Sequence, residues 1–131
     1  MTIYRSDACR NALMTALNTQ RGASAKIQIK TLAPSGASSG SLLAELTGNG
    51  AGWGTPTNGV LTSSAITADS SADATGTAAH YEILTSGSTW LESGAVDGTD
   101  GVTIDNTAIG IGQTVQMSGN WVNTAAYDDG V

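Results

Sequence analysis

The residues Lys26-Ile27-Gln28-Ile29-Lys30 alternate polar and apolar side chains, and the chain before them has a different period. Strict alternation is typical of a half-buried strand, with Ile27 and Ile29 on the inner face. Clusters of Gly, Ser, Asn and Pro separate further runs of this kind, at residues 42–47, 60–67, 77–84, 89–96, 102–105 and 113–122. The sequence is therefore expected to be mainly β, an antiparallel β-sandwich or jelly roll of about seven to eight strands.

The predicted strand at 77–84 separates apolar from ionisable side chains. Tyr81 and Ile83 lie on one face, and His80 and Glu82 lie on the other. The sequence supplies no strong candidate for the nucleophile and the carboxylate that His80 would need in a catalytic triad. We therefore expect His80 and Glu82 to form a half-exposed pair on the outer face of a sheet.

Two other features help to define the strands. Ser86-Gly87-Ser88 is typical of a tight hairpin turn between the strands at 77–84 and 89–96. The strand at 113–122 is expected to face the core through three residues: Val115, Met117 and Trp121.

Residues 6–21 have the period of one α-helix. Ser6 or Asp7 is placed to cap its N-terminus, and Gly22 follows Arg21 as a C-terminal cap. The apolar face of this helix is expected to consist of Cys9, Ala12, Leu13, Ala16 and Leu17. On that face Cys9 would be packed rather than reactive. No second helical period appears, which disfavours a βαβ fold.

The length of 131 residues indicates one domain. Large aliphatic residues are few, but only 12% of the residues are charged, so the composition differs from that of disordered chains. We expect a helical arm at 1–24, a β-sandwich domain at 25–122 and a C-terminal tail at 123–131.

The charges are distributed unevenly along the chain. The formal net charge is −6, yet no basic residue follows Lys30. This asymmetry suggests that the N-terminal segment has its own partner, although a short helix also needs some solvated charge. We expect residues 1–24 to dock on another subunit rather than complete the sandwich core. The candidate interface residues are Arg5, Arg10, Leu13, Leu17, Arg21, Trp53 and Tyr127.

Catalytic and cofactor sites are not expected. Residues 36–40 match the string G-x-S-x-G, but Pro34 precedes them and a strand-like Leu42-Leu43 follows, whereas a nucleophile elbow lies between a strand and a helix. We therefore predict that the chain is not an enzyme and holds no cofactor or metal.

Two weaker binding hypotheses remain open. Asp97 to Asn106 gathers oxygen ligands of the type that calcium prefers, although Asp-Gly pairs also form ordinary turns. Trp53, Trp90 and Trp121 could form an aromatic platform for sugars, although such residues more often fill a core or an interface.

Nucleic acid and membranes are not expected as partners. An acidic chain repels phosphate groups, and no apolar run approaches the length of about 18 residues that a membrane span needs. The first ten residues also lack the apolar region of a secretory signal.

Several stretches resemble small structural proteins of tailed bacteriophages. These stretches are residues 39–47, 58–61, 73–81, 93–98, 105–106 and 112–115. The resemblance covers about residues 26–118 and consists of turns and strand starts. It implies a β-sandwich of the virion, assembled in the host cytoplasm, as a head decoration or cement protein that bridges capsid subunits.

The resemblance also implies the partners. They would be the major capsid protein or another virion protein, together with further copies of this chain as a dimer or trimer. A place in the neck or tail is an alternative. From a different class, the alternative is a carbohydrate- or surface-binding β-sandwich module of a fibre or adhesin.

Overall fold

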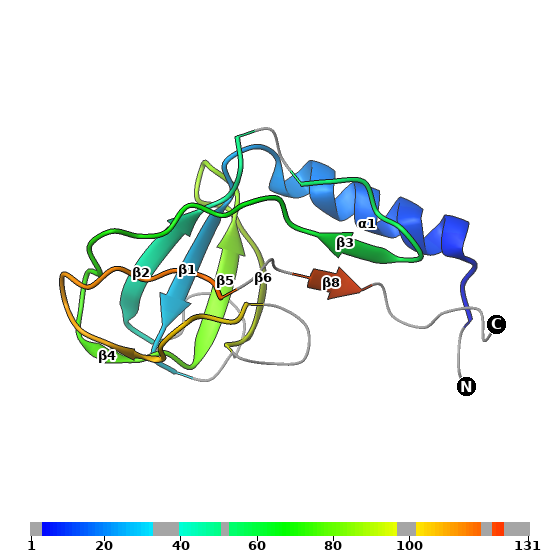
Figure 1. Ribbon diagram of the computed structural model, residues 1–131. Coiled ribbons are helices and arrows are strands. Elements are labelled where there is room, and N and C mark those ends of the chain that lie inside the picture. Colours follow the sequence, from blue (N-terminus) through cyan, green and yellow to red (C-terminus); the bar gives the residue numbers. More distant parts are fainter. Residues whose placement is uncertain (1–3, 33–39, 51–52, 97–101, 119–121, 125–131) are drawn as a thin grey trace.

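A computed structural model describes residues 4–32, 40–50, 53–96, 102–118 and 122–124 of the chain (Figure 1). The protein is mainly β, with one N-terminal helix and strands in antiparallel sheets. The elements in chain order are α1 (Asp7–Arg21), β1 (Lys26–Lys30), β2 (Leu42–Thr47), β3 (Val60–Thr62), β4 (Gly76–Thr77), β5 (His80–Leu84), β6 (Trp90–Ala95), β7 (Ala108–Ile109) and β8 (Val122–Thr124).

A four-stranded sheet in the order β2-β1-β5-β6 forms the centre of the fold. In β1, Ile27 pairs with Leu46 on one side and with Ile83 on the other. All three side chains are fully buried, as the alternation in the sequence predicted. The predicted hairpin turn at 86–88 is confirmed, because the Thr85 and Thr89 backbones bond across it.

The predicted strands are found in part. Those at 26–30, 42–47 and 89–96 correspond to β1, β2 and β6, but only residues 60–62 of the run at 60–67 form a strand. The prediction of continuous strands at 102–105 and 113–122 was wrong: residues 102–118 contain only β7 and isolated bridges. Val115 is buried and Met117 packs against the core, whereas Trp121 lies outside the described residues.

A second layer covers the apolar face of the sheet and completes a β-sandwich. It consists of the segments around β4 and β7, which pair with each other and are joined further by mutual backbone bonds between Asp69 and Val115. Its buried residues Val102, Ile104 and Ile109 belong to the same core as the isoleucines of the sheet. The core therefore lies between the two layers (Figure 1).

The outer edge of β2 is covered by the chain itself. Thr47 and Thr67 exchange backbone hydrogen bonds of 3.1 and 2.8 Å. The Glu45 amide donates to Oδ2 of Asp69 at 2.9 Å, and the Asp73 amide donates to the Leu43 carbonyl at 2.8 Å. These bonds engage four outward backbone groups of the edge strand within the chain: the Thr47 amide and carbonyl, the Glu45 amide and the Leu43 carbonyl.

Helix α1 begins and ends where the sequence predicts. The Ser6 hydroxyl accepts from the Cys9 amide, and the Gly22 amide donates to the Asn18 carbonyl. The helix extends beyond the sheet, with β3 lying along it (Figure 1). Among the described residues, no helix is long and apolar enough to cross a membrane.

The prediction of which residues form the buried face of α1 was wrong. The helix buries Arg10, Met14 and Arg21, and Met14 and Leu17 contact the core of the same chain. Cys9, expected to be packed, is exposed, as are Ala12, Leu13 and Ala16. The predicted face points outward because the other side of α1 is held to the chain, where Arg21 pairs with Glu92 of β6 and Arg10 lies against the turn at Gly59. The helix therefore contributes Met14 and Leu17 to the core. This finding contradicts the expectation that residues 1–24 would not take part in the core.

Gly59 shows how closely α1 and the turn before β3 approach each other. Its φ of +73° favours glycine, and a Cβ added there would lie 2.5 Å from Cζ of the buried Arg10. The Gly59 amide also donates to Oδ1 of Asn11 at 2.7 Å. The backbone of this turn therefore forms part of the site that holds Arg10.

We expect Gly59→Ala to destabilise the protein more than Gly112→Ala does. Both glycines have positive φ, which costs an L-residue about 1–3 kcal/mol. A Cβ at Gly112 meets nothing within 4 Å, whereas a Cβ at Gly59 displaces the Arg10 guanidinium. Urea unfolding of the two variants measures the difference, and equal losses would show that Arg10 adjusts freely.

Candidate functional site

The face of the four-stranded sheet opposite the core carries a continuous group of polar side chains. Strand register aligns Glu45, Gln28, Glu82 and Ser93 across β2, β1, β5 and β6. The next row includes Lys30 beside His80. We call this group the polar face; its members are Lys26, Gln28, Lys30, Glu45, His80, Glu82, Trp90 and Ser93.

An ionic cluster occupies the centre of the polar face. Nζ of Lys30 lies 2.7 Å from Oε2 of Glu82, and Nε2 of His80 lies 3.6 Å from Oε1 of Glu82. Only 7% of Lys30, 1% of Glu82 and 0% of His80 is exposed. The prediction of a half-exposed His80–Glu82 pair was therefore wrong, since both residues are buried with Lys30 as a partner.

Each ring nitrogen of His80 faces an oxygen acceptor. Nδ1 faces the carbonyl oxygen of Leu32, which only accepts hydrogen bonds. Nε2 points to the carboxylate of Glu82. The carboxylate is thus placed between an ammonium group and the imidazole, and the cluster joins β1, β5 and the residues that follow β1.

Partly exposed residues surround this buried cluster. Nε2 of Gln28 donates to Oε2 of Glu45 at 2.8 Å, and Nζ of Lys26 donates to the Ser88 hydroxyl at 2.8 Å. Nε1 of Trp90 donates to the Ser93 hydroxyl at 2.9 Å. The indole of Trp90 therefore lies at the margin of the polar face, with 40% of the residue exposed.

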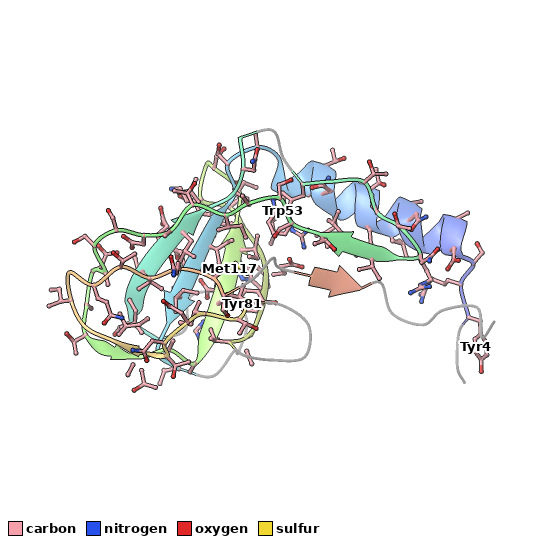
Figure 2. All side chains as sticks on the ribbon, viewed as in Figure 1. Tyr4, Trp53, Tyr81 and Met117 are labelled. Atoms are coloured by element: carbon pink, nitrogen blue, oxygen red, sulfur yellow. The ribbon has the colours of Figure 1, made fainter. Side chains whose placement is uncertain are left out.

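A second buried charge connects α1 to the edge strand β6. The Arg21 guanidinium pairs with the Glu92 carboxylate, and its Cζ lies 4.6 Å from the centroid of the Trp53 ring. Burial lowers the pKa of Arg21, and the charge of Glu92 opposes that shift. Nδ2 of Asn18 donates to the Trp53 carbonyl at 3.0 Å. Trp53 lies where the end of α1 meets the sheet (Figure 2).

The structure places the predicted interface residues in different environments, and only some of them are exposed. Arg10, Arg21 and Trp53 are buried within the chain, so they are not available to a partner in this fold. Leu17 is partly buried against the core, and Arg5 is partly exposed. Leu13 is 47% exposed. Tyr127 lies outside the described residues.

Other predicted binding features give no site in the described residues. These contain no group of three or more His, Cys, Asp or Glu residues that could hold a metal ion. Most of the 36–40 string and residues 97–101 of the acidic loop lie outside the described residues. At the end of that loop, Oδ1 of Asn106 accepts from the Ala108 amide at 3.0 Å, as in an ordinary turn.

Sequence reasoning missed Lys30 as the partner of Glu82. Lys30 ends the strand that the alternation predicts, and the polar positions of neighbouring strands point to the same side of a sheet. The available signal was that opposite charges occupied polar positions on two predicted strands. It did not identify the pair, because the strand order and register were not known.

We expect Glu82→Gln to lower the free energy of unfolding by about 3–5 kcal/mol, because it leaves the Lys30 ammonium buried without a counter-charge. Combining Lys30→Met with Glu82→Leu should recover most of that loss, since apolar residues replace buried ion pairs well.

Glu45→Gln is the matched control for Glu82→Gln. Oε1 of Glu45 lies 4.0 Å from Nζ of Lys26, and both side chains are partly exposed. The expected loss in the free energy of unfolding is therefore below about 1 kcal/mol. Chemical unfolding measures all of these variants. Similar losses for Glu82→Gln and Glu45→Gln would contradict a structural role for the buried cluster.

The chain was also compared with known proteins. Neither the family models, nor the curated proteins, nor the solved structures give a match to it. The functional argument accordingly depends on the residues and contacts described above.

Proposed function

We propose that this chain is a non-enzymatic structural protein of a bacteriophage particle, acting as a decoration or cement protein that binds capsid subunits. In this role the surface of a small rigid domain binds the capsid subunits, and the ionisable side chains of the interior stabilise that domain. The partners would be the major capsid protein and further copies of the chain.

The extension of α1 beyond the sheet is the observation that carries this proposal (Figure 1). Exposed apolar side chains lie along it and at its start: Leu13 is 47% exposed and Tyr4 is 64% exposed. Tyr4 lies at the end of α1 that is remote from the sandwich (Figure 2). An extension of this kind reaches beyond the body of the domain and offers apolar contacts to a neighbouring subunit.

The buried ionic cluster supports the non-enzymatic part of the proposal. His80 and Glu82 are the residues that acid–base chemistry would use first, yet both are buried and engaged with Lys30 and the Leu32 carbonyl. These contacts give them a structural task in the sheet. The phage setting is supported by the sequence resemblance over residues 26–118.

Electron microscopy of particles from the source of this sequence tests the proposal. An antibody against the purified chain should label the head shell, and the chain should remain with particles through density-gradient purification. Label on the neck or tail would keep the structural role but change its position. Absence of the chain from purified particles would refute a virion role.

A carbohydrate-binding module is the second candidate, and Trp90 is the observation that favours it. Its indole is 40% exposed at the margin of the polar face, which carries the amide of Gln28 and the carboxylate of Glu45 on strands further across the sheet. Sugars stack on such rings and bond to such groups. Trp53 is buried and does not contribute to a platform of this kind.

If the second candidate holds, the isolated chain will bind glycans on an array, and Trp90→Ala will remove that binding without changing the melting temperature by more than a few degrees. Val60→Ala, at a partly buried position on another strand, is the control. Failure of the native chain to bind any glycan would refute the carbohydrate-binding candidate and leave the structural role as the remaining one.

A further inference from the structure

Asparagine is followed by glycine at two places in the sequence, Asn49-Gly50 and Asn58-Gly59. Such pairs are prone to deamidation, because glycine has no Cβ to hinder the approach of its amide nitrogen to the asparagine side chain. Both pairs lie among the residues that the structure describes. They differ in how the fold holds the glycine nitrogen, which is the group that reacts.

Deamidation of this kind proceeds through a cyclic imide. The main-chain nitrogen of the glycine gives up its proton and attacks Cγ of the asparagine, so that a bond from nitrogen to Cγ forms. The bond from Cγ to the side-chain nitrogen breaks, and ammonia leaves with the proton that the glycine nitrogen gave up. Water then opens the imide at either carbonyl and yields aspartate or isoaspartate. The reaction therefore needs a glycine nitrogen that can lose its proton and rotate toward Cγ.

The fold opposes this reaction at Asn58. The Gly59 amide donates to Oδ1 of Asn11 at 2.7 Å, so removal of its proton would leave a negative nitrogen facing an oxygen lone pair. Thr57 and Val60 exchange two backbone hydrogen bonds of 2.9 Å across the turn. These bonds restrain the rotation that would bring the Gly59 nitrogen to the side chain.

At Asn49 the glycine nitrogen is not held in this way. Gly50 is exposed, and its amide donates no hydrogen bond to any residue that the structure describes. The bonds of this loop involve the preceding groups: the Gly48 amide donates to the Ala25 carbonyl at 2.7 Å, and the Asn49 carbonyl accepts from the Ser24 amide at 3.1 Å. Rotation of the peptide between Asn49 and Gly50 therefore breaks one hydrogen bond.

The space around the two glycines differs as well. A Cβ added at Gly59 would lie 2.5 Å from Cζ of the buried Arg10. A Cβ added at Gly50 would meet, among the described residues, Oγ of Ser24 alone within 4 Å, at an ordinary contact distance of 3.7 Å. Gly59 is thus enclosed on this side, whereas Gly50 has room for the rotation that ring closure needs.

We propose that Asn49 is the site at which the folded chain deamidates, and that Asn11 protects Asn58 from the same reaction. The modification replaces a neutral amide by a carboxylate, as aspartate or isoaspartate. The inference goes beyond the proposed function and does not depend on it, because it is tested on the purified chain alone.

The modification would act where α1 joins the central sheet. Ser24 and Ala25, which bond to the Asn49 carbonyl and the Gly48 amide, lie between α1 and β1. An isoaspartate adds a methylene group to the main chain and displaces the carbonyl at position 49 from the Ser24 amide. It also adds negative charge to a chain whose net charge is already −6. We therefore expect the Ser24 amide to exchange its hydrogen faster in the aged chain.

Site-resolved mass spectrometry of the aged native chain tests the inference. Chymotrypsin cleaves after Leu46, Trp53 and Leu61, so the two asparagines lie on separate peptides. During incubation at neutral pH, deamidation should be about tenfold or more faster at Asn49 than at Asn58, because a hydrogen bond that must be lost slows a reaction by about that factor. Equal rates in the folded chain, or faster reaction at Asn58, would overturn the inference.

The same chain unfolded in guanidinium chloride is the control for the effect of the fold. Both asparagines precede glycine, so their deamidation rates should become similar once the contacts of Asn11 and Arg10 are lost. A difference that persists in the unfolded chain would assign it to the flanking sequence and would also overturn the inference.

Asn11→Ala tests the protecting hydrogen bond. It removes the acceptor of the Gly59 amide and should raise the deamidation rate of Asn58 about tenfold while leaving that of Asn49 unchanged. Asn11→Asp keeps an oxygen acceptor at this position and is the matched control, in which Asn58 should stay protected. A folded Asn11→Ala chain in which Asn58 stays protected would overturn the role of Asn11.

Amide hydrogen exchange of the native chain examines the same bond without a variant, and it decides the question if Asn11→Ala does not fold. The Gly59 amide should exchange about tenfold or more slowly than the Gly50 amide, because the first donates to Asn11 and the second is exposed. Exchange of Gly59 as fast as that of Gly50 would overturn the protection that the inference requires.

Discussion

The ion pair between Lys30 and Glu82 is the constraint on which the central sheet depends. Its two side chains come from neighbouring strands, β1 and β5, and are 52 positions apart in the sequence. Because both groups are buried, each requires the other: the cost of removing either charge from water is offset only while the partner is in place. The pair therefore selects the register in which Lys30 lies beside His80 and Gln28 beside Glu82. A shift by one residue would separate the charges and also move Ile27 and Ile29 away from the core.

The second buried charge has a similar effect on the position of the helix. Arg21 reaches Glu92 on β6 and lies over Trp53, so the C-terminal end of α1 is held against the sheet. At the other end, Arg10 lies against the backbone of Gly59 and pairs with Asp7. The arginines therefore serve the interior of the chain, and the surface that remains outside is uncharged. The same contacts hold the helix in place and decide which of its sides faces outward.

The sequence predicted the features that depend on neighbouring residues and missed those that depend on distant ones. The alternation at Lys26–Lys30, the cap at Ser6 and the turn at 86–88 are local, and the structure has each of them. The orientation of α1 depends on contacts of Arg21 with a residue 71 positions away, so the apolar period alone gave the wrong face. His80 and Glu82 were expected at the surface for the same reason, since only the strand order brings Lys30 to them. The segment 102–118 contains strand-like residues but forms mainly isolated bridges, because it crosses the sheet as a covering layer.

The bonds along the outer edge of β2 have a consequence for the way in which this sheet meets other molecules. An edge strand with free amides and carbonyls is a template for strands of other molecules, and crowding of identical chains on a surface would make such pairing frequent. In this chain residues 67–73 already occupy that edge through the partners of Leu43, Glu45 and Thr47. Neighbouring molecules therefore cannot extend the sheet through β2. This edge of the sheet is therefore protected against the strand-by-strand pairing that builds fibrils.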